Sequence, residues 1–304
     1  GAGRRHLLSG APAVRRGVAL GLGAYLCWGF LPLFFKLLGG VDPVEIVAQR
    51  VVWSVVLLLV LIAAVGRLPQ LAAAWANPRA RLLLAASALL IGTNWLVYVW
   101  AINAAHVLET SLGYFLNPLV NVVMGVVLLK ERLSRAQGIA VLLAAAGVAV
   151  LAIGAASGLW ISLALAGTFA TYGLIRKIAP VESLEGLAIE TILLVPVALG
   201  YLGWLAAGGA LAFGSGLGVS ALLVMGGAVT AVPLLLFAAA ARLLPYSTLG
   251  LLQYLAPSIQ FLLATLAFGE PLTLAHLICF ACIWSGLAIF AADSARQARA
   301  ISVR

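Results

Sequence analysis

Long apolar segments, each bounded by a few polar, glycine or proline residues, run along almost the whole chain. Each is roughly 20 residues long, the length that a helix needs to cross about 30 Å of hydrocarbon. The apolar runs lack the alternation of a membrane β-strand, so the pattern predicts helices. The ten predicted spans cover about residues 17–38, 43–65, 81–102, 107–129, 135–153, 158–177, 182–205, 217–241, 245–268 and 273–292.

A motif in the fourth predicted span recurs in the ninth. Residues 114–118 read Tyr-Phe-Leu-Asn-Pro and residues 253–257 read Gln-Tyr-Leu-Ala-Pro, and thirteen residues after each proline comes a glutamate, Glu131 or Glu270. The same separation of 139 residues relates Asn121 to Gln260 and Gly147 to Gly286. A duplicated chain is the simplest interpretation. Because each half has five spans, an odd number, the second half enters the membrane from the opposite side, and the repeat is inverted.

The predicted fold is therefore an all-α polytopic membrane protein with ten transmembrane helices in two inverted five-helix repeats. Residues 17–153 form the first repeat and residues 158–292 the second, with a basic segment at 1–16 and a tail at 293–304. Of the 304 residues, 64% are hydrophobic and 9% charged, which is too little polar surface for a water-soluble domain. The net charge of +9 comes from short clusters between the spans, so it predicts contact with a lipid bilayer rather than with nucleic acid.

Sixteen of the 18 Lys and Arg residues fall on one side of the membrane if the N-terminus is cytoplasmic. They are Arg4, Arg5, Arg15, Arg16, Arg67, Arg79, Arg81, Lys130, Arg132, Arg135, Arg176, Lys177, Arg242, Arg296, Arg299 and Arg304. The opposite loops, at about 39–42, 103–106, 154–157, 206–216 and 269–272, contain neither residue type. The positive-inside rule therefore predicts a protein of the cytoplasmic membrane with both termini in the cytoplasm.

Ionisable residues within the spans are candidates for coupling or gating. Arg50 lies about 13 Å deep, near the midplane, and its repeat mate Glu190 lies about equally deep from the other side. Each buried charge costs at least about 2.5 to 3.5 kcal/mol, so each needs a partner or a water-filled cavity. Arg50 has three open interpretations: an ion pair with Glu45 or another carboxylate, a latch with Glu190, or contact with a solute. Glu109, beside His106, is a third candidate, as a protonatable pair or an interfacial hydrogen-bonded pair.

Amide and aromatic side chains recur at helical spacing on three spans. They are Asn94, Trp95 and Tyr98 on the third span, Tyr114, Asn117 and Asn121 on the fourth, and Gln253, Tyr254 and Gln260 on the ninth. Such residues either form hydrogen bonds between helices, typically worth about 0.6 kcal/mol each in membranes, or line a solute-binding cavity. Pro118 and Pro257 each free a backbone carbonyl and are predicted to kink or break their helices.

Several chemistries find no support in the sequence. It contains no G-x-x-x-x-G-K-[ST] motif for nucleotide phosphates, no H-E-x-x-H motif and no repeated Cys/His spacing, so no metal site or cofactor is expected. Cys279 and Cys282 lie within an apolar span, where packing is their expected role. No pair of facing acids suits an intramembrane enzyme, so catalysis is not expected.

Short blocks of sequence, spread from residue 25 to residue 254, carry a family resemblance. They are Tyr25-x-x-Trp28-Gly29-x-x-Pro32, Arg50-Val51-Val52-Trp53-Ser54, Asn94-Trp95, Ser111–Pro118, Tyr172–Lys177, Ile189-Glu190-Thr191 and Ser247–Tyr254. In this order they resemble the RarD subgroup of the EamA family, in the drug/metabolite transporter superfamily. The resemblance implies ten helices in two inverted repeats around a central cavity. Relatives are commonly labelled chloramphenicol-sensitivity proteins or drug/metabolite permeases.

The expected function is that of a secondary transporter, a permease that moves a small organic metabolite, amino acid or drug-like solute by alternating access. The cavity is expected between the third, fourth, eighth and ninth spans, with contributions from the first and sixth. Protons are the candidate coupling ion. A passive channel or facilitator is the alternative, and it would show neither counterflow nor dependence on a proton gradient.

Overall fold

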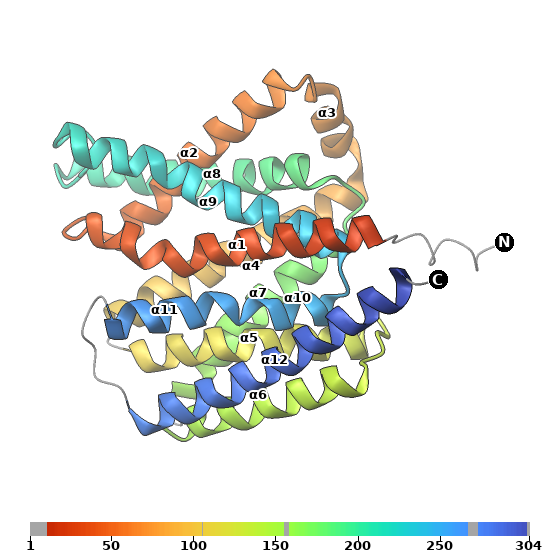
Figure 1. Ribbon diagram of the computed structural model, residues 1–304. Helices are drawn as coiled ribbons and strands as arrows, with labels where there is room; N and C mark the ends of the chain where they lie inside the picture. The colour runs from red at the N-terminus through yellow and green to blue at the C-terminus, as the bar shows by residue number, and fades with distance from the viewer. Residues whose placement is uncertain (1–10, 105, 155–157, 267–272, 303–304) are drawn as a thin grey trace.

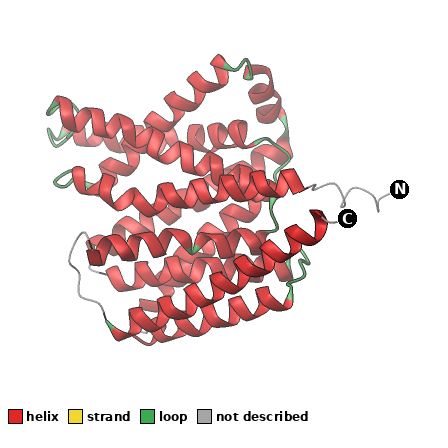
Figure 2. Ribbon diagram, in the orientation of Figure 1, coloured by secondary structure: helices red, strands yellow, loops and turns green. Residues whose placement is uncertain are grey.

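The computed structural model describes residues 11–104, 106–154, 158–266 and 273–302, and within these ranges it contains helices and no strand (Figure 2). In the first half the helices are α1 (Ala11–Leu37), α2 (Pro43–Ala64), α3 (Leu68–Ala76), α4 (Pro78–Asn103), α5 (Val107–Val127) and α6 (Arg135–Gly154). In the second half they are α7 (Leu159–Ile178), α8 (Ser183–Ala207), α9 (Leu217–Leu243), α10 (Tyr246–Gln253), α11 (Leu255–Leu266) and α12 (Leu274–Ser302).

Nine of the described helices are long and apolar enough to cross a membrane. The remaining span, expected as one helix over residues 245–268, is divided into α10 and α11 at Tyr254. The break has a local cause, because Pro257 has no N–H to donate to the carbonyl four residues before it. Two further differences are the short helix α3, which the apolar pattern did not indicate, and α12, which continues to Ser302 through most of the expected tail.

The membrane helices run between two ends of the bundle (Figure 1). α1 begins and α12 ends at the end that we call the basic end; α1 ends and α9 begins at the opposite one, the cavity end. α6 packs against α12 along one edge of the bundle, and α2 packs against α8 and α9 along the other. The remaining spans lie between these two edges, and α5 packs against both α7 and α10.

The contact between α6 and α12 displays the inverted symmetry directly. A Cβ atom at Gly147 would lie 2.9 Å from the carbonyl oxygen of Cys279, and one at Gly286 would lie 2.8 Å from that of Ala140. Ala140 and Cys279 have the same sequence separation as the two glycines. One close backbone contact therefore occurs twice, related by a two-fold axis, as an inverted repeat requires.

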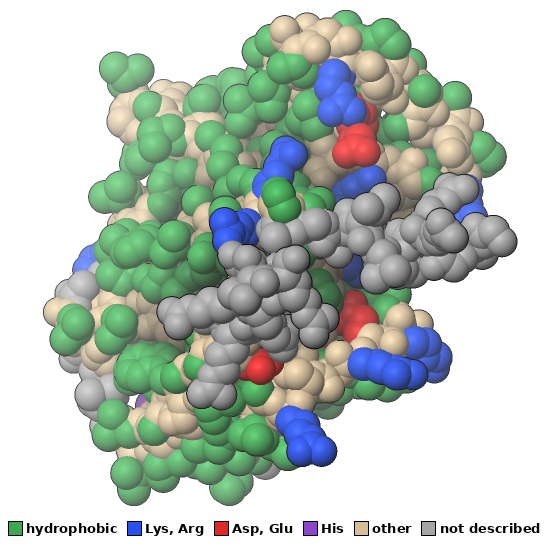
Figure 3. All heavy atoms as spheres, turned by 45° about the vertical axis from the view of Figure 1, so that its right-hand side comes forward, with side chains coloured by type: hydrophobic (Ala, Val, Ile, Leu, Met, Phe, Trp, Pro, Cys, Tyr) green, Lys and Arg blue, Asp and Glu red, His purple; other side chains and the backbone are tan. Residues whose placement is uncertain are grey.

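Lys and Arg side chains gather on the face at the basic end (Figure 3). Arg79, Arg81, Lys130, Arg132 and Arg135 are exposed. Two other cations of the cytoplasmic count, Lys177 and Arg176, have structural roles instead. Lys177 Nζ donates to the carbonyls of Ala241, at 2.9 Å, and Leu244, at 2.5 Å, at the C-terminus of α9, where a helix has unpaired acceptors. Arg176 is only 2% exposed, so it is a buried charge rather than a contact for lipid head groups.

Candidate functional site

A cavity of about 160 Å³ lies between the two repeats. Its walls come from α1, α2, α4 and α5 of the first repeat and from α7, α9, α10 and α11 of the second. Among the candidate residues, those that line it are Arg50, Asn94, Trp95, Tyr98, Tyr114, Asn117, Gln253, Pro257 and Gln260. Asn121, Tyr254, Glu109, Glu190 and Pro118 lie outside this lining. The helices that line the cavity include all those expected, and Arg50 adds α2.

The lining is aromatic and amide-rich, with a single cation. Six aromatic side chains contribute to it: Trp28, Phe35, Trp95, Tyr98, Tyr114 and Phe169. Four amides and the hydroxyl of Thr230 supply polar groups, and no Asp or Glu among the described residues lines the cavity. Tyr114 is 42% exposed, so the cavity is not fully enclosed by protein. Such a lining suits an organic solute with a flat apolar body and a few polar groups.

Arg50 is held by a hydroxyl and two rings. Its Nε donates to Thr230 Oγ1 at 2.6 Å, and its Cζ lies 5.3 Å from the centroid of the Phe35 ring and 5.4 Å from that of Trp95. These distances are within the range of cation–π attraction. Among the described residues, Arg50 forms no ion pair with Glu45 or Glu190, the two partners considered from the sequence.

Glu45 and Glu131 instead hold backbone amides of the other repeat. Glu45 accepts the N–H groups of Ala212, at 3.0 Å, and Phe213, at 3.1 Å, in the loop between α8 and α9. Glu131 accepts the N–H groups of Tyr246, at 2.6 Å, and Ser247, at 2.9 Å, at the N-terminus of α10, where a carboxylate is favourable. Its repeat mate, residue 270, lies outside the described residues.

Asn94, Gln253 and Gln260 join helices and line the cavity at the same time. The bonds run from Asn94 Nδ2 to Leu165 O (2.9 Å), from Asn121 Nδ2 to Gln253 Oε1 (2.7 Å) and from Gln260 Nε2 to Trp28 O (2.9 Å). Asn117 differs, because its Oδ1 accepts no hydrogen bond from the described residues. The two interpretations of the polar stripe of α5, which consists of Tyr114, Asn117 and Asn121, are therefore compatible, and Asn121 belongs to the structural part of it.

The two prolines and Tyr254 influence how α5, α10 and α11 pack beside the cavity. α5 continues through Pro118, whereas Pro257 lies in the first turn of α11. A Cβ atom at Gly250 would lie 2.8 Å from the Pro118 carbonyl oxygen, so α10 and α5 approach closely at this point. Tyr254 is 1% exposed and donates its hydroxyl to the Phe115 carbonyl at 3.2 Å, which also joins the two spans.

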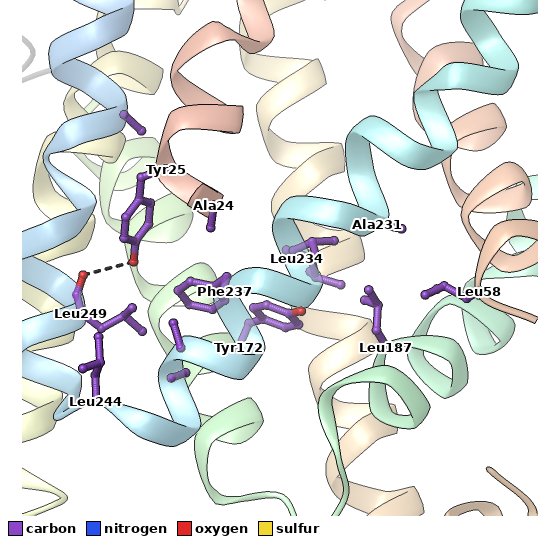
Figure 4. Close-up of a cluster of buried hydrophobic side chains, with 14 of the residues drawn as sticks. Ala24, Tyr25, Leu58, Tyr172, Leu187, Ala231, Leu234, Phe237, Leu244 and Leu249 are labelled. Atoms are coloured by element: carbon purple, nitrogen blue, oxygen red, sulfur yellow. Dashed lines mark hydrogen bonds between the residues drawn. The ribbon is translucent and has the colours of Figure 1, made fainter. Parts of the chain in front are cut away.

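A layer of buried aromatic side chains closes the bundle between the cavity and the basic end. We call it the aromatic plug, and it consists of Tyr25, Tyr172, Phe237 and Tyr246, each with 0% exposure. Figure 4 shows the first three of these side chains. Tyr25 donates to the Leu249 carbonyl at 3.1 Å, and Tyr246 donates to the Ala170 carbonyl at 2.6 Å.

The plug begins where the cavity ends. Trp28 and Phe169, which line the cavity, have ring centroids 5.6 Å and 5.4 Å from that of Phe237. On α1, α7 and α9 the plug residues lie nearer the basic end than the cavity residues do. The cavity is consequently closed by packed side chains toward the basic end.

Glu190 lies outside the cavity, in a buried polar cluster beside the plug. Its Oε1 is 3.5 Å from Arg176 Nη1 and accepts the hydroxyl of Ser87, and its Oε2 accepts the hydroxyl of Tyr172 at 3.5 Å. The partner Arg176 was not foreseen from the sequence. Space for its guanidinium exists because Gly186 has no side chain: a Cβ there would lie 2.8 Å from Arg176 Cζ.

Glu109 lies at the cavity end, apart from both the cavity and the plug. Its Oε1 is 3.5 Å from His106 Nδ1, and its backbone carbonyl accepts the hydroxyl of Ser162 at 2.6 Å. The bond to Ser162 joins α5 to α7, and the contact with His106 is compatible with both interpretations of the pair.

Known proteins resemble this chain over nearly its full length. Residues 15–153 match the EamA-like transporter family. A protein described as an uncharacterized transporter of Pseudomonas aeruginosa is 50% identical, with 94% of this chain and 96% of that protein covered. Protein RarD of Escherichia coli is 45% identical, with 93% and 96% covered. A protein of known crystal structure shares the fold with a TM-score of 0.72 at 21% identity, over 90% of this chain and 96% of the other. The chain is therefore a membrane transporter of the EamA-like transporter family and belongs to its RarD subgroup.

Proposed function

We propose that the protein is a secondary transporter that moves a small organic solute by alternating access between its two inverted repeats. The observation that carries the proposal is a partly open cavity between the repeats, separated from the basic end by the aromatic plug. Inverted symmetry allows a second conformation, in which the side now closed by the plug is open and the opposite side is closed. Aromatic and amide groups in the lining suit an amphipathic metabolite, amino acid or drug-like molecule.

Purified protein in liposomes distinguishes the transporter from a passive channel. The transporter predicts that unlabelled solute trapped inside accelerates uptake of labelled solute, and that an imposed pH gradient changes the uptake rate. Protons are the coupling ion in this proposal, with Glu190 as their carrier, because Glu190 contacts Tyr172 of the plug. A channel would give flux that is independent of both trapped solute and pH gradient.

The basic end faces the cytoplasm in this proposal, and the cavity opens to the outside. In a background without Cys27, Cys279 and Cys282, a cysteine placed in the loop at 206–216 should react in intact cells with an impermeant maleimide. A cysteine at Arg79 should react only after the cells are opened. The reverse labelling pattern would contradict the orientation.

Tyr114 and Asn121 lie on one face of α5 and should give opposite phenotypes. Tyr114→Ala removes a 42% exposed ring from the cavity wall, so we expect roughly three- to tenfold weaker solute binding and nearly unchanged stability. Asn121→Ala leaves the buried Gln253 Oε1 without its donor, so we expect a loss of about 1 kcal/mol in unfolding free energy. Thermal unfolding and solute uptake, measured on both variants, check this division. Equal effects of the two changes on both measurements would mean that the stripe has one role.

A further inference from the structure

The guanidinium of Arg50 has a free hydrogen-bonding edge in the cavity. Nε is occupied by Thr230, and the rings of Phe35 and Trp95 lie beside the group. Nη1 and Nη2 donate to no protein atom among the described residues, although Arg50 lines the cavity and is only partly buried. The group is thus positioned by its neighbours, with donors left for something that enters the cavity.

The charge of Arg50 also has no counterion in the described part of the chain. α2 packs against α4, α8 and α9, and α4 and α9 contain no Asp or Glu. The acids on α2 and α8 are engaged elsewhere: Glu45 with Ala212 and Phe213, Glu185 with Arg67 at 2.7 Å, and Glu190 with Arg176. A cation in a site of low dielectric attracts an anion strongly when no protein carboxylate competes for it.

The shape and lining of the cavity narrow the anion to an organic one. A guanidinium binds a carboxylate through two parallel hydrogen bonds, and its planar donors match that group. Around Arg50 the wall is aromatic, and an inorganic anion has no apolar surface to pack against these rings. The cavity of about 160 Å³ is close to the size of an engineered cavity that admits benzene.

We propose that the solute is a small aromatic monocarboxylate, with its carboxylate on Arg50 and its ring against the aromatic wall. This inference rests on the proposed function, because it assumes that the cavity is the solute site. Arg50 confers specificity for charge, and the surrounding rings confer specificity for a flat apolar body. Neutral and cationic analogues of the same size lack the group that Arg50 recognises.

Matched probes test the inference on the full-length wild-type protein in detergent. Benzoate, benzamide and benzylamine, and the corresponding phenylacetate series, differ in charge at nearly constant size. We expect the two carboxylates to raise the thermal unfolding temperature in a saturable manner, and the amides and amines to leave it unchanged. Equal effects of all three charge types, or no effect of the carboxylates, would overturn the proposal.

Variants test whether Arg50 is the residue that binds the carboxylate. Arg50→Gln should weaken carboxylate binding by roughly 10- to 100-fold, and Arg50→Lys by less, because it keeps the charge and loses the planar pair of donors. Thr230→Val should cause a smaller loss because it frees Nε without removing the charge. Lys36→Gln, outside the cavity lining, is the control and should bind as the wild type does. Unchanged carboxylate binding by folded Arg50→Gln protein would overturn the assignment.

The transport assay separates this inference from the proposed function. Carboxylate binding that depends on Arg50, without accelerated exchange in liposomes, would support the inference and contradict transport by alternating access. Accelerated exchange of a neutral or cationic solute, without Arg50-dependent carboxylate binding, would support transport by alternating access and contradict the inference.

Discussion

Replacing Gly173 with alanine is expected to open the basic end of the bundle. A Cβ atom at this position of α7 would collide with the hydroxyl of Tyr246 and lie 2.9 Å from Cζ of Phe237. Neither ring can retreat easily, because both are fully buried and Tyr246 is held by its bond to the Ala170 carbonyl. The added methyl group therefore acts as a wedge within the plug and favours the conformation in which the plug is separated.

Thiol labelling measures this opening. A cysteine at Ala240, which has 0% exposure beside the plug, should react at least about tenfold faster in the Gly173→Ala protein, since a minor open state of a few per cent would become substantial. Gly167→Ala on the same helix is the matched control, because a Cβ there meets nothing within 4 Å. Equal labelling rates in the two variants would show that the plug does not close the basic end.

Glu190→Leu is expected to lower the unfolding free energy by about 3 to 5 kcal/mol, because it leaves the guanidinium of Arg176 buried without its carboxylate. Both side chains are almost fully buried, so water cannot take the place of the missing partner. Adding Arg176→Met should recover a large part of the loss, because the double variant buries no charge. Denaturant unfolding of the two single variants and the double variant gives the coupling energy.

An exposed ion pair supplies the control for Glu190. Glu182 and Arg242 form an ion pair of 3.2 Å, with side-chain exposures of 60% and 29%. Glu182→Gln should change the unfolding free energy by less than about 1 kcal/mol. Similar losses in Glu190→Leu and Glu182→Gln would mean that the buried cluster carries no special stability.

The spans were predictable because membrane thickness determines their length. Nine of the ten correspond to single helices, and the tenth differs where Pro257 removes a hydrogen-bond donor. The duplication was equally visible, since the repeated glycines Gly147 and Gly286 make equivalent contacts. Sequence could not reveal the short α3, whose residues follow the end of a span without a distinct pattern.

The side-chain partners were less predictable, because depth along a helix says little about which neighbour a side chain faces. Arg50 and Glu190 lie at matching depths in the two repeats, yet Arg50 contacts Thr230 and Glu190 contacts Arg176. Arg176 was counted as a loop cation because it is two residues from the end of α7. Its burial depends on the space left by Gly186 on another helix.

The polar stripe of α5 illustrates the same limit. Helical spacing placed Tyr114, Asn117 and Asn121 on one face, and the structure divides that face between the cavity and a bond to Gln253. Only the packing of α10 against α5 decides where the division falls.

Alternating access is tested most directly by distances between spin labels at both ends of the bundle. One pair, at Val14 on α1 and Ile178 on α7, reports on the basic end; the other, at Leu37 on α1 and Leu163 on α7, reports on the cavity end. All four positions are exposed, so the labels disturb little packing. Alternating access predicts that Gly173→Ala lengthens the basic-end distance and shortens the cavity-end distance. Two distances that change in the same direction, or a variant that changes neither, would contradict it.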